Sequence, residues 1–270
     1  MIEKFKEAAL VAGQEAMKIY ETDFMVEDKE DGSPVTIADQ AAEDVIIKIL
    51  GEAFPDLTVI GEESTAAGKV PETCNRFVIV DPIDGTKEFI KKNGEFTVNI
   101  GLIEGGVAIA GVVYAPALGE LYWGDCHNGA FKATVENNKI VSTKPIRSRG
   151  LDENNVVVLA SRSHRTPETQ SLIDRLGNVE VMAAGSSLKF CRLAEGAADF
   201  YPRLSPTMEW DTAAGQAVLT AAGGATIVSG GGPLLYNKRD ETNQRAFENP
   251  FFIAVGDEQI ISRFSLKSGW

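Results

Sequence analysis

The sequence predicts a protein of the α/β (α+β) class, in which helices and sheets stack in layers. Two observations predict this class. The first half of the 270-residue chain has two amphipathic helices followed by short apolar strands, and the second half alternates strands with helices. Hydrophobic residues make up 44% of the chain and charged residues 24%, which is enough apolar material for a substantial core in a soluble protein.

A pair of helices and an antiparallel sheet are predicted for the first half of the chain. Apolar residues recur at helical spacing over Ile2–Tyr20 and again over Ala38–Phe54, where Pro55 ends the second helix. The short apolar run Phe77–Val80 is typical of a buried strand, and it is followed by segments that predict a hairpin and further strands. These segments are Phe96–Ile103 and Val107–Tyr114, joined by Glu104-Gly105-Gly106, and the strands near residues 120–123 and 130–133.

The pattern changes after the basic, turn-prone stretch Lys144–Arg149, so we expect a domain boundary there. This divides the chain into an N-terminal part, residues 1–147, and a C-terminal part, residues 148–270. Strands and helices alternate in the second part, which is typical of layered α/β folds. The predicted strands are residues 156–160, 179–183, 225–228 and 251–255, and the predicted helices are residues 166–176, 186–198 and 210–222.

The charge balance argues against several classes of partner. Lys and Arg number 26 against 39 Asp and Glu, so the net charge is -13 with His neutral. Binding to a nucleic acid polymer or to an anionic membrane needs basic faces. No apolar run is long enough for a membrane-spanning helix, and the N-terminus has no basic segment followed by an apolar one. We therefore expect a cytoplasmic protein without stable membrane insertion, and peripheral association with the inner membrane stays an open alternative.

Cysteine and histidine are too rare for several kinds of site. Cys74, Cys126 and Cys191 are far apart and odd in number, which is typical of reduced thiols and not of a disulfide framework. His127 and His164 are the two histidines, so a zinc site built from nitrogen and sulfur ligands is not expected. Any bound metal should therefore have oxygen ligands, as Mg²⁺, Mn²⁺ and Ca²⁺ do.

The segment Asp81-Pro82-Ile83-Asp84-Gly85-Thr86 follows a predicted strand and contains two carboxylates close together. Asp81, Asp84 and the backbone carbonyl of Ile83 can form a compact cage of hard oxygen ligands for a cation. Gly85 lets the backbone approach a ligand, and Thr86 adds a hydroxyl. The alternative is an Asx-type turn that only caps the next segment. That alternative explains one Asp, but not two acids together with Gly and Thr.

Three further acids each have an ordinary structural explanation. Glu62, next to Glu63, can belong to a solvated loop. Asp211 is most simply a helix N-cap. Asp39 can be a cap or a first-turn acid of the second predicted helix. Each explanation is adequate alone, whereas their combination with the Asp81 segment points to a shared site.

All of these acids except Asp39 lie in three segments, Glu62-Glu63-Ser64, Asp81-Pro82-Ile83-Asp84-Gly85-Thr86 and Trp210-Asp211-Thr212-Ala213-Ala214-Gly215. The segments resemble the three motifs of the Mg²⁺-dependent, lithium-sensitive phosphatase superfamily. That superfamily contains inositol monophosphatases, fructose bisphosphatases and 3'(2'),5'-bisphosphate nucleotidases. The order of the motifs matches, and the resemblance extends over nearly the whole chain. It implies a layered α-β-α-β-α sandwich of the inositol monophosphatase and sugar phosphatase type.

The residues after Thr86 indicate a branch of that superfamily. Inositol monophosphatases usually have an Asn-Phe pair soon after this Thr, whereas this chain has Lys87-Glu88-Phe89-Ile90, which resembles the bacterial 3'(2'),5'-bisphosphate nucleotidases of the CysQ type. Ser161-Arg162-Ser163-His164 and Gly185-Ser186-Ser187-Leu188-Lys189-Phe190 resemble the same branch. The resemblance implies hydrolysis of the 3'-phosphate of 3'-phosphoadenosine 5'-phosphate (adenosine 3',5'-bisphosphate) to AMP and phosphate. The sulfated nucleotide 3'-phosphoadenylyl sulfate is implied as a further substrate.

The resemblance also implies a role for each site residue. Thr86 and Asp39 would activate the attacking water, and Glu62 is a further catalytic residue. Clustered Mg²⁺ ions can neutralise an anionic phosphate and stabilise the leaving alkoxide. The residues implied to hold two or three Mg²⁺ ions are Glu62, Asp81, Ile83 through its carbonyl, Asp84 and Asp211. The implied substrate contacts are Glu62, Ile83, Asp84, Gly85, Thr86, Ser161, His164, Ser186, Lys189 and Asp211, with Arg203 as a further candidate.

Two other functions stay open on the sequence. One is a different phosphatase of the same superfamily, acting on inositol monophosphate or a sugar bisphosphate. The other is a non-catalytic regulator that binds Mg²⁺ or a nucleotide on the same scaffold. For single residues, Lys189 can be a solvated helix residue and His164 an ordinary loop residue. The expected partner is a small nucleotide, and the oligomeric state stays open.

Overall fold

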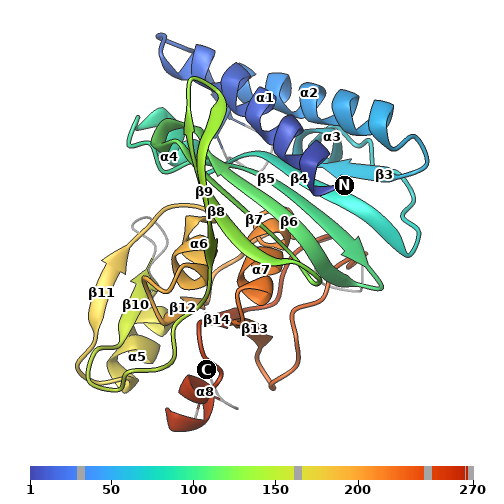
Figure 1. Cartoon of the computed structure of the whole chain (residues 1–270). Helices are drawn as coiled ribbons and strands as arrows, with labels where there is room; N and C mark the ends of the chain where they lie inside the picture. Colours follow the sequence, from blue (N-terminus) through green and yellow to red (C-terminus); the bar gives the residue numbers. More distant parts are fainter. Residues whose placement is uncertain (29–33, 161–165, 240–244, 265, 267–270) are drawn as a thin grey trace.

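The computed structural model describes residues 1–28, 34–160, 166–239, 245–264 and 266. Its helices and sheets alternate in α-β-α-β-α layers, which confirms the predicted fold class (Figure 1). Two helices cover one face of a seven-stranded sheet, two more lie between that sheet and a five-stranded sheet, and another two cover the far side. From the first layer to the last, these helices are α1 (Ile2–Tyr20) and α2 (Ile37–Ala53), α6 (Leu188–Ala194) and α7 (Ala213–Ala221), and α5 (Pro167–Arg175) and α8 (Gln259–Arg263).

The seven-stranded sheet carries most of the predicted site. Its strands lie in chain order from β3 to β9, and β3 runs parallel to β4 while the other neighbours are antiparallel. Two short helices, α3 (Glu62–Ala66) and α4 (Thr86–Ile90), directly follow β3 and β4. The strands are β3 (Thr58–Gly61), β4 (Arg76–Asp84), β5 (Thr97–Glu104), β6 (Val107–Ala115), β7 (Glu120–Asp125), β8 (Gly129–Glu136) and β9 (Lys139–Ile146), with the 3-10 helix η1 (Pro116–Leu118) between β6 and β7.

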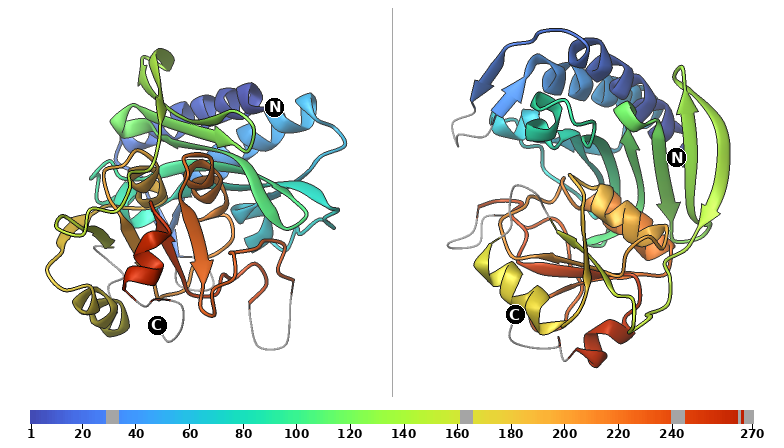
Figure 2. Two further views of the ribbon diagram at one scale, coloured as in Figure 1. Left: turned by 60° about the horizontal axis from the view of Figure 1, so that its bottom comes forward. Right: turned by 90° about the vertical axis from the view of Figure 1, so that its left-hand side faces the viewer.

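The five-stranded sheet has the order β11-β10-β12-β14-β13 and mixes parallel with antiparallel pairs. A separate antiparallel pair, β1 with β2, lies before α2. The first helix, α1, and the last helix, α8, lie in the two outer layers (Figure 2). The remaining strands are β1 (Val26–Asp28), β2 (Pro34–Thr36), β10 (Val157–Ala160), β11 (Glu180–Ala183), β12 (Phe200–Arg203), β13 (Ala225–Val228) and β14 (Phe252–Val255).

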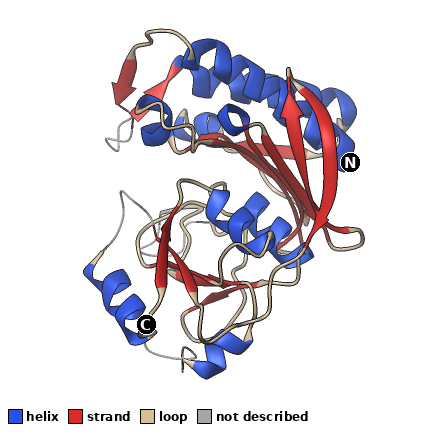
Figure 3. Cartoon of the chain, turned by 60° about the vertical axis from the view of Figure 1, so that its left-hand side comes forward, coloured by secondary structure: helices blue, strands red, loops and turns tan. Residues whose placement is uncertain are grey.

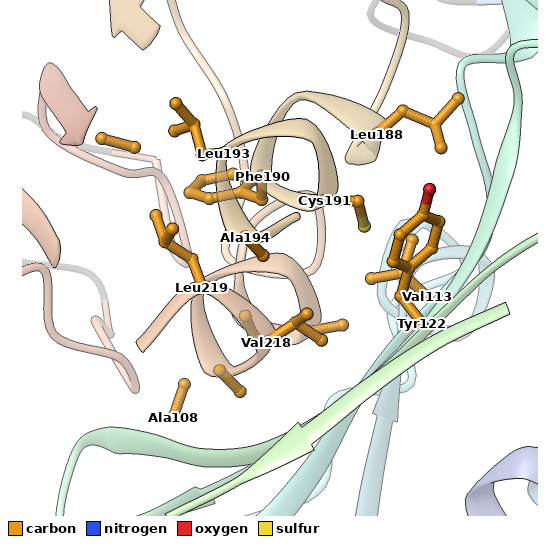
Figure 4. Packing of buried hydrophobic residues seen from close by; sticks show 14 of the residues in the cluster. Ala108, Val113, Tyr122, Leu188, Phe190, Cys191, Leu193, Ala194, Val218 and Leu219 are labelled. Carbon is orange, nitrogen blue, oxygen red and sulfur yellow. The ribbon is translucent and has the colours of Figure 1, made fainter. Parts of the chain in front are cut away.

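Side chains of the seven-stranded sheet alternate between two cores. Val78 and Val80 pack with α1 and α2, whereas Phe77 and Ile79 belong to the core that includes α6 and α7. The layered arrangement is visible when the helices and strands are coloured separately (Figure 3). Figure 4 shows the side chains of the middle helix layer packed together in this second core. A helix layer enclosed between two sheets has to be apolar on most sides, which accounts for the mostly apolar, fully buried run of residues 213–219 in α7.

Most of the predicted elements are confirmed, with differences at their ends. The predicted helix 186–198 is shorter because Ser186 and Gly196, on either side of α6, have positive φ values of 45° and 74°. The prediction of a turn-prone stretch at Lys144–Arg149 is wrong at its start, because β9 extends to Ile146. β9 has almost only exposed side chains, so no apolar alternation marks it. The division into residues 1–147 and 148–270 stays a prediction.

Within the described residues, none of the helices is both long and apolar enough to cross a membrane.

A row of glycines on the sheet lets α7 lie very close to it. Gly101 of β5 pairs with Gly111 of β6, which pairs with Gly124 of β7. A Cβ atom at Gly111 would lie 2.5 Å from the carbonyl oxygen of Ala214 and 2.8 Å from its Cα atom. A Cβ atom at Gly124 would lie 2.8 Å from the Cβ atom of Ala221. Side chains larger than hydrogen at these positions would therefore push the helix away from the sheet.

Gly111→Ala should destabilise the protein, because the added methyl group would meet the backbone of α7. We expect the free energy of unfolding to fall by about 1–3 kcal/mol, the usual cost of overpacking a core. Urea denaturation followed by circular dichroism measures this change. Gly51→Ala is the matched control, because nothing lies within 4 Å of its Cβ position in α2, and alanine should raise helix stability by up to about 1 kcal/mol. A G111A protein as stable as the control would contradict the close packing of α7.

Candidate active site

The carboxylates of Asp81, Asp84 and Asp211 converge at the end of β4, with one oxygen from each lying within 4.8 Å of the others. Residues three apart on a regular strand point to opposite faces. Here Asp81 pairs with Asn99 and Asp84 with Thr97, so three steps on β4 match two steps on β5 through a bulge. The extra residue restores both aspartates to one face.

Asp211 reaches this cluster from the other half of the chain, directly before α7. The N-cap residue of α7 is Thr212, so the alternative that Asp211 is only the N-cap is wrong. Asp211 Oδ2 instead accepts a hydrogen bond from the N–H of Met208 at 2.9 Å. Ser187 joins the two halves, because its Oγ lies 2.9 Å from Asp84 Oδ2 and 2.7 Å from the carbonyl oxygen of Asp211.

The cluster concentrates negative charge. Burial raises the pKa of Asp211 to about 8, and the nearby carboxylates of Asp84 and Glu62 add to this effect. Like charges held this close favour either a shared proton or a bound cation. The donors are carboxylate oxygens, which suit Mg²⁺ and do not suit a soft metal. The residues present therefore fit the oxygen-bound metal that the sequence led us to expect.

Asp39 has two roles that the sequence presented as alternatives. Its Oδ2 accepts hydrogen bonds from the N–H and the hydroxyl of Thr36, both at 2.8 Å, which forms a capping box at the start of α2. Its Oδ1 lies 3.4 Å from Thr86 Oγ1. The same Thr86 oxygen lies 3.3 Å from the carbonyl oxygen of Ile83. The helix cap thus orients the acid whose other oxygen faces the site.

The turn between β4 and α4 brings Gly85 against the middle helix layer. Gly85 has φ 91° and ψ 44°, a left-handed conformation that favours glycine. A Cβ atom there would lie 3.3 Å from both the Cβ and the Oγ of Ser186. Ser186 Oγ donates a hydrogen bond to the carbonyl oxygen of Asp84 at 3.0 Å. The predicted contact residues Gly85 and Ser186 therefore lie side by side.

A cleft of about 270 Å³ opens at the carboxylate cluster. Glu62, Asp84 and Asp211 line it together with Thr86. Asp81 and Ile83 are buried, each with 1% of its surface exposed. Ser161 and His164, predicted to contact substrate, lie outside the described residues.

Cationic side chains also line the cleft, namely Lys87, Lys189 and Arg203. Lys189 is buried, with 4% exposure, so the alternative of a solvated helix residue is wrong. Its Nζ donates a hydrogen bond to the carbonyl oxygen of Ala184 at 3.3 Å and lies 5.3 Å from the centre of the Tyr201 ring. Burial lowers the pKa of Lys189 to about 8, and the nearby Arg203 contributes to this shift. One cleft thus contains both an acidic cluster and buried positive charge.

Several site residues were not predicted from the sequence. Asn99 is buried on β5, with its Nδ2 lying 3.0 Å from Ser187 Oγ and 3.4 Å from Asp84 Oδ2. Its signal was available, because Thr97 and Asn99 are polar residues at alternate positions of an otherwise apolar strand. Ser187 and the cleft-lining Glu88 stand in segments that resemble the nucleotidases, but nothing in those segments singles them out, since serine and glutamate are ordinary next to turns and in short helices.

Comparison with known proteins places these features in a family. The model of the inositol monophosphatase family matches residues 1–255. The 3'(2'),5'-bisphosphate nucleotidase CysQ of Salmonella typhimurium is 42% identical over 254 residues, which cover 93% of this chain and 98% of that protein. The protein of the same name from Haemophilus influenzae is 31% identical over 260 residues, covering 93% and 91%.

Solved structures agree with the sequence comparisons. CysQ from Bacteroides thetaiotaomicron, described as a bacterial member of the inositol monophosphatase family, superposes with a TM-score of 0.78 at 40% identity, covering 94% of this chain and 96% of that chain. The extragenic suppressor protein suhB from Bartonella henselae has the same fold, with a TM-score of 0.76 at 24% identity over 98% and 97% of the two chains. The match of the family model over most of the sequence, together with these relatives, shows that the chain belongs to the inositol monophosphatase family.

Proposed function

We propose that this protein is a Mg²⁺-dependent phosphomonoesterase that removes the 3'-phosphate of adenosine 3',5'-bisphosphate, giving AMP and phosphate. The observation that carries the proposal is the convergence of Asp81, Asp84 and Asp211 beside the Thr86–Asp39 pair in one cleft. Relatives named 3'(2'),5'-bisphosphate nucleotidase align over nearly the whole chain and support the choice of substrate. The sulfated nucleotide 3'-phosphoadenylyl sulfate is the second substrate that we propose.

The proposed metal ligands are the carboxylates of the acidic cluster, Glu62 and one backbone carbonyl. When bound, two or three Mg²⁺ ions would neutralise the substrate phosphate, lower the pKa of an attacking water and stabilise the leaving oxygen. The raised pKa of Asp211 supports this assignment, because it reports negative charge that a cation would offset. The proposed ligands are Glu62, Asp81, Ile83, Asp84 and Asp211.

Thr86 and Asp39 are proposed to take up the proton of the attacking water. Thr86 Oγ1 can donate its hydrogen to Asp39 Oδ1 while its own lone pair accepts a hydrogen bond from the water. The capping box uses Asp39 Oδ2, because both Thr36 donors bond to that oxygen, whereas Thr86 contacts Oδ1. Glu62 lines the same cleft and completes the proposed catalytic group.

The cationic side chains of the cleft suit the second phosphate of a bisphosphate nucleotide. Lys189 and Arg203 line the same cleft as the proposed metal ligands, and Ser186 adds a hydroxyl next to Gly85. A substrate with two phosphates would place one at the proposed metal ligands and the other at these cations. Ser161 and His164 stay predicted nucleotide contacts.

Phosphate release from a panel of substrates tests the proposal. With Mg²⁺, we expect faster release from adenosine 3',5'-bisphosphate than from inositol 1-phosphate or fructose 1,6-bisphosphate. Adenosine 5'-monophosphate is the control, because it lacks the 3'-phosphate. EDTA should abolish release. Faster turnover of inositol phosphate would make the protein a different phosphatase, and binding of the nucleotide without phosphate release would make it a regulator.

Asp84→Asn should lower kcat by at least about 100-fold, the range seen when one electrostatic stabiliser of a transition state is removed. The protein should stay folded, because the substitution removes one of three neighbouring negative charges. Steady-state kinetics and a thermal melt measure the two effects. Asp125→Asn is the control, since Asp125 accepts hydrogen bonds from the N–H groups of His127 and Asn128 in the β7–β8 turn. Full activity of D84N would remove Asp84 from the site.

The raised pKa of Asp211 predicts how the stability of the metal-free protein depends on pH. An unfolded Asp titrates near about 3.9, and Asp211 in the folded protein titrates at about 8. Between these values the folded state binds more protons than the unfolded state, so the free energy of unfolding should fall as pH rises from about 4 to about 8. Urea denaturation in EDTA measures this slope. Asp211→Asn should remove much of it, and an identical slope in both proteins would contradict the assignment.

A further inference from the structure

The short helix α3 begins with the proposed metal ligand Glu62 and has no cap of its own. The N-cap residue is Gly61, which offers no side-chain acceptor. The first N–H groups of a helix need acceptors from elsewhere when no such cap is present. The position of Glu62 therefore depends on whichever group binds the start of α3.

Glu43 of α2 supplies that group. Its Oε2 accepts a hydrogen bond from the N–H of Glu63 at 2.8 Å, and its Oε1 accepts from the N–H and the hydroxyl of Ser64 at 2.7 and 2.5 Å. The Glu43 side chain is fully buried, at 0% exposure. In the part of the chain that the structure describes, Glu43 forms no ion pair. The negative charge of its buried carboxylate is therefore stabilised by these three hydrogen-bond donors.

The contact between Glu43 and α3 restricts which residue can precede this helix. A Cβ atom at Gly61 would overlap the carboxyl group of Glu43, so glycine is needed for the close approach. Asp39 and Glu43 lie four residues apart on α2 and therefore share one face of that helix. Asp39 contacts Thr86 on one side of the cleft, and Glu43 holds the segment of Glu62 on another. One helix face thus supports two separate parts of the site.

We infer that Glu43 is a positioning residue that sets the place of Glu62 in the metal site. This inference rests on the proposed function, because it takes Glu62 as a metal ligand. Glu62 lines the cleft with Asp84 and Asp211 and is close enough to raise the pKa of Asp211. Groups that orient a ligand in this way usually change metal affinity by about 10–100-fold when they are replaced.

Glu43→Gln tests the inference with nearly unchanged volume. An amide has one acceptor oxygen, so its NH₂ group would face an N–H or hydroxyl donor of α3. We expect the Kd for Mg²⁺, measured by calorimetry without substrate, to rise by about tenfold or more. The kcat at saturating Mg²⁺ should fall by a smaller factor, because excess metal refills a weakened site.

Asp199→Asn is the matched control. Asp199 is also a buried carboxylate, at 3% exposure, and it accepts hydrogen bonds from the N–H of Val157 and from Arg149. It does not belong to the residues that line the cleft in the described structure. D199N should lower Tm but leave the Kd for Mg²⁺ unchanged, which separates a general loss of stability from a change at the metal site.

Ser64→Ala is the second variant, because it removes a single hydrogen bond to Glu43 and keeps both backbone donors. It should raise the Kd for Mg²⁺ in the same direction as E43Q but less, and it decides the outcome if E43Q does not fold. Unchanged Mg²⁺ affinity in the folded variants, beside a wild type that binds Mg²⁺ and releases phosphate, would overturn the positioning role alone. A wild type that neither binds Mg²⁺ nor releases phosphate would overturn the proposed function and this inference together.

Discussion

The close approach of α7 to the seven-stranded sheet is the constraint on which the site depends. Gly101, Gly111 and Gly124 form a row across three neighbouring strands, and the backbone of α7 occupies the space that side chains would otherwise fill. Asp211 directly precedes this helix, so the depth at which α7 packs sets how far its carboxylate reaches toward β4. A spacing larger by one methyl group would open the contact among three carboxylates that lie within 4.8 Å.

Concentrating these carboxylates is unfavourable in the absence of a cation, and several rigid contacts hold them in place. The bulge in β4 turns Asp81 and Asp84 to one face, and Ser187 connects Asp84 to the backbone of Asp211 across the layers. Asp39 is held in place by the capping box at the start of α2. If these carboxylates bind a metal as proposed, their preformed arrangement would avoid reorganisation when the metal and a phosphate bind, which makes electrostatic catalysis effective.

The net charge of the chain is -13, and part of this negative charge is concentrated in the cleft. Its carboxylates suit cations, and the buried Lys189 and the half-buried Arg203 line the same cleft. With a metal bound, the carboxylate cluster would present positive charge to the substrate as well, so the whole cleft would attract a polyanion. The acidic composition of the chain is therefore compatible with an anionic small molecule as substrate, although it argues against nucleic acid polymers.

The sequence by itself determined the main helices, the β5–β6 hairpin, the alternation of the second half and the carboxylates of the three motifs, because each of these is a pattern among neighbours along the chain. Only the tertiary structure decided which acids lie close together. It showed that Asp39 both caps α2 and contacts Thr86, and that Lys189 is buried in the cleft. It also revealed Ser187, which meets Asp84 across 103 residues of chain. Such contacts arise where separate layers pack together, and the spacing of residues within one segment carries no information about that packing.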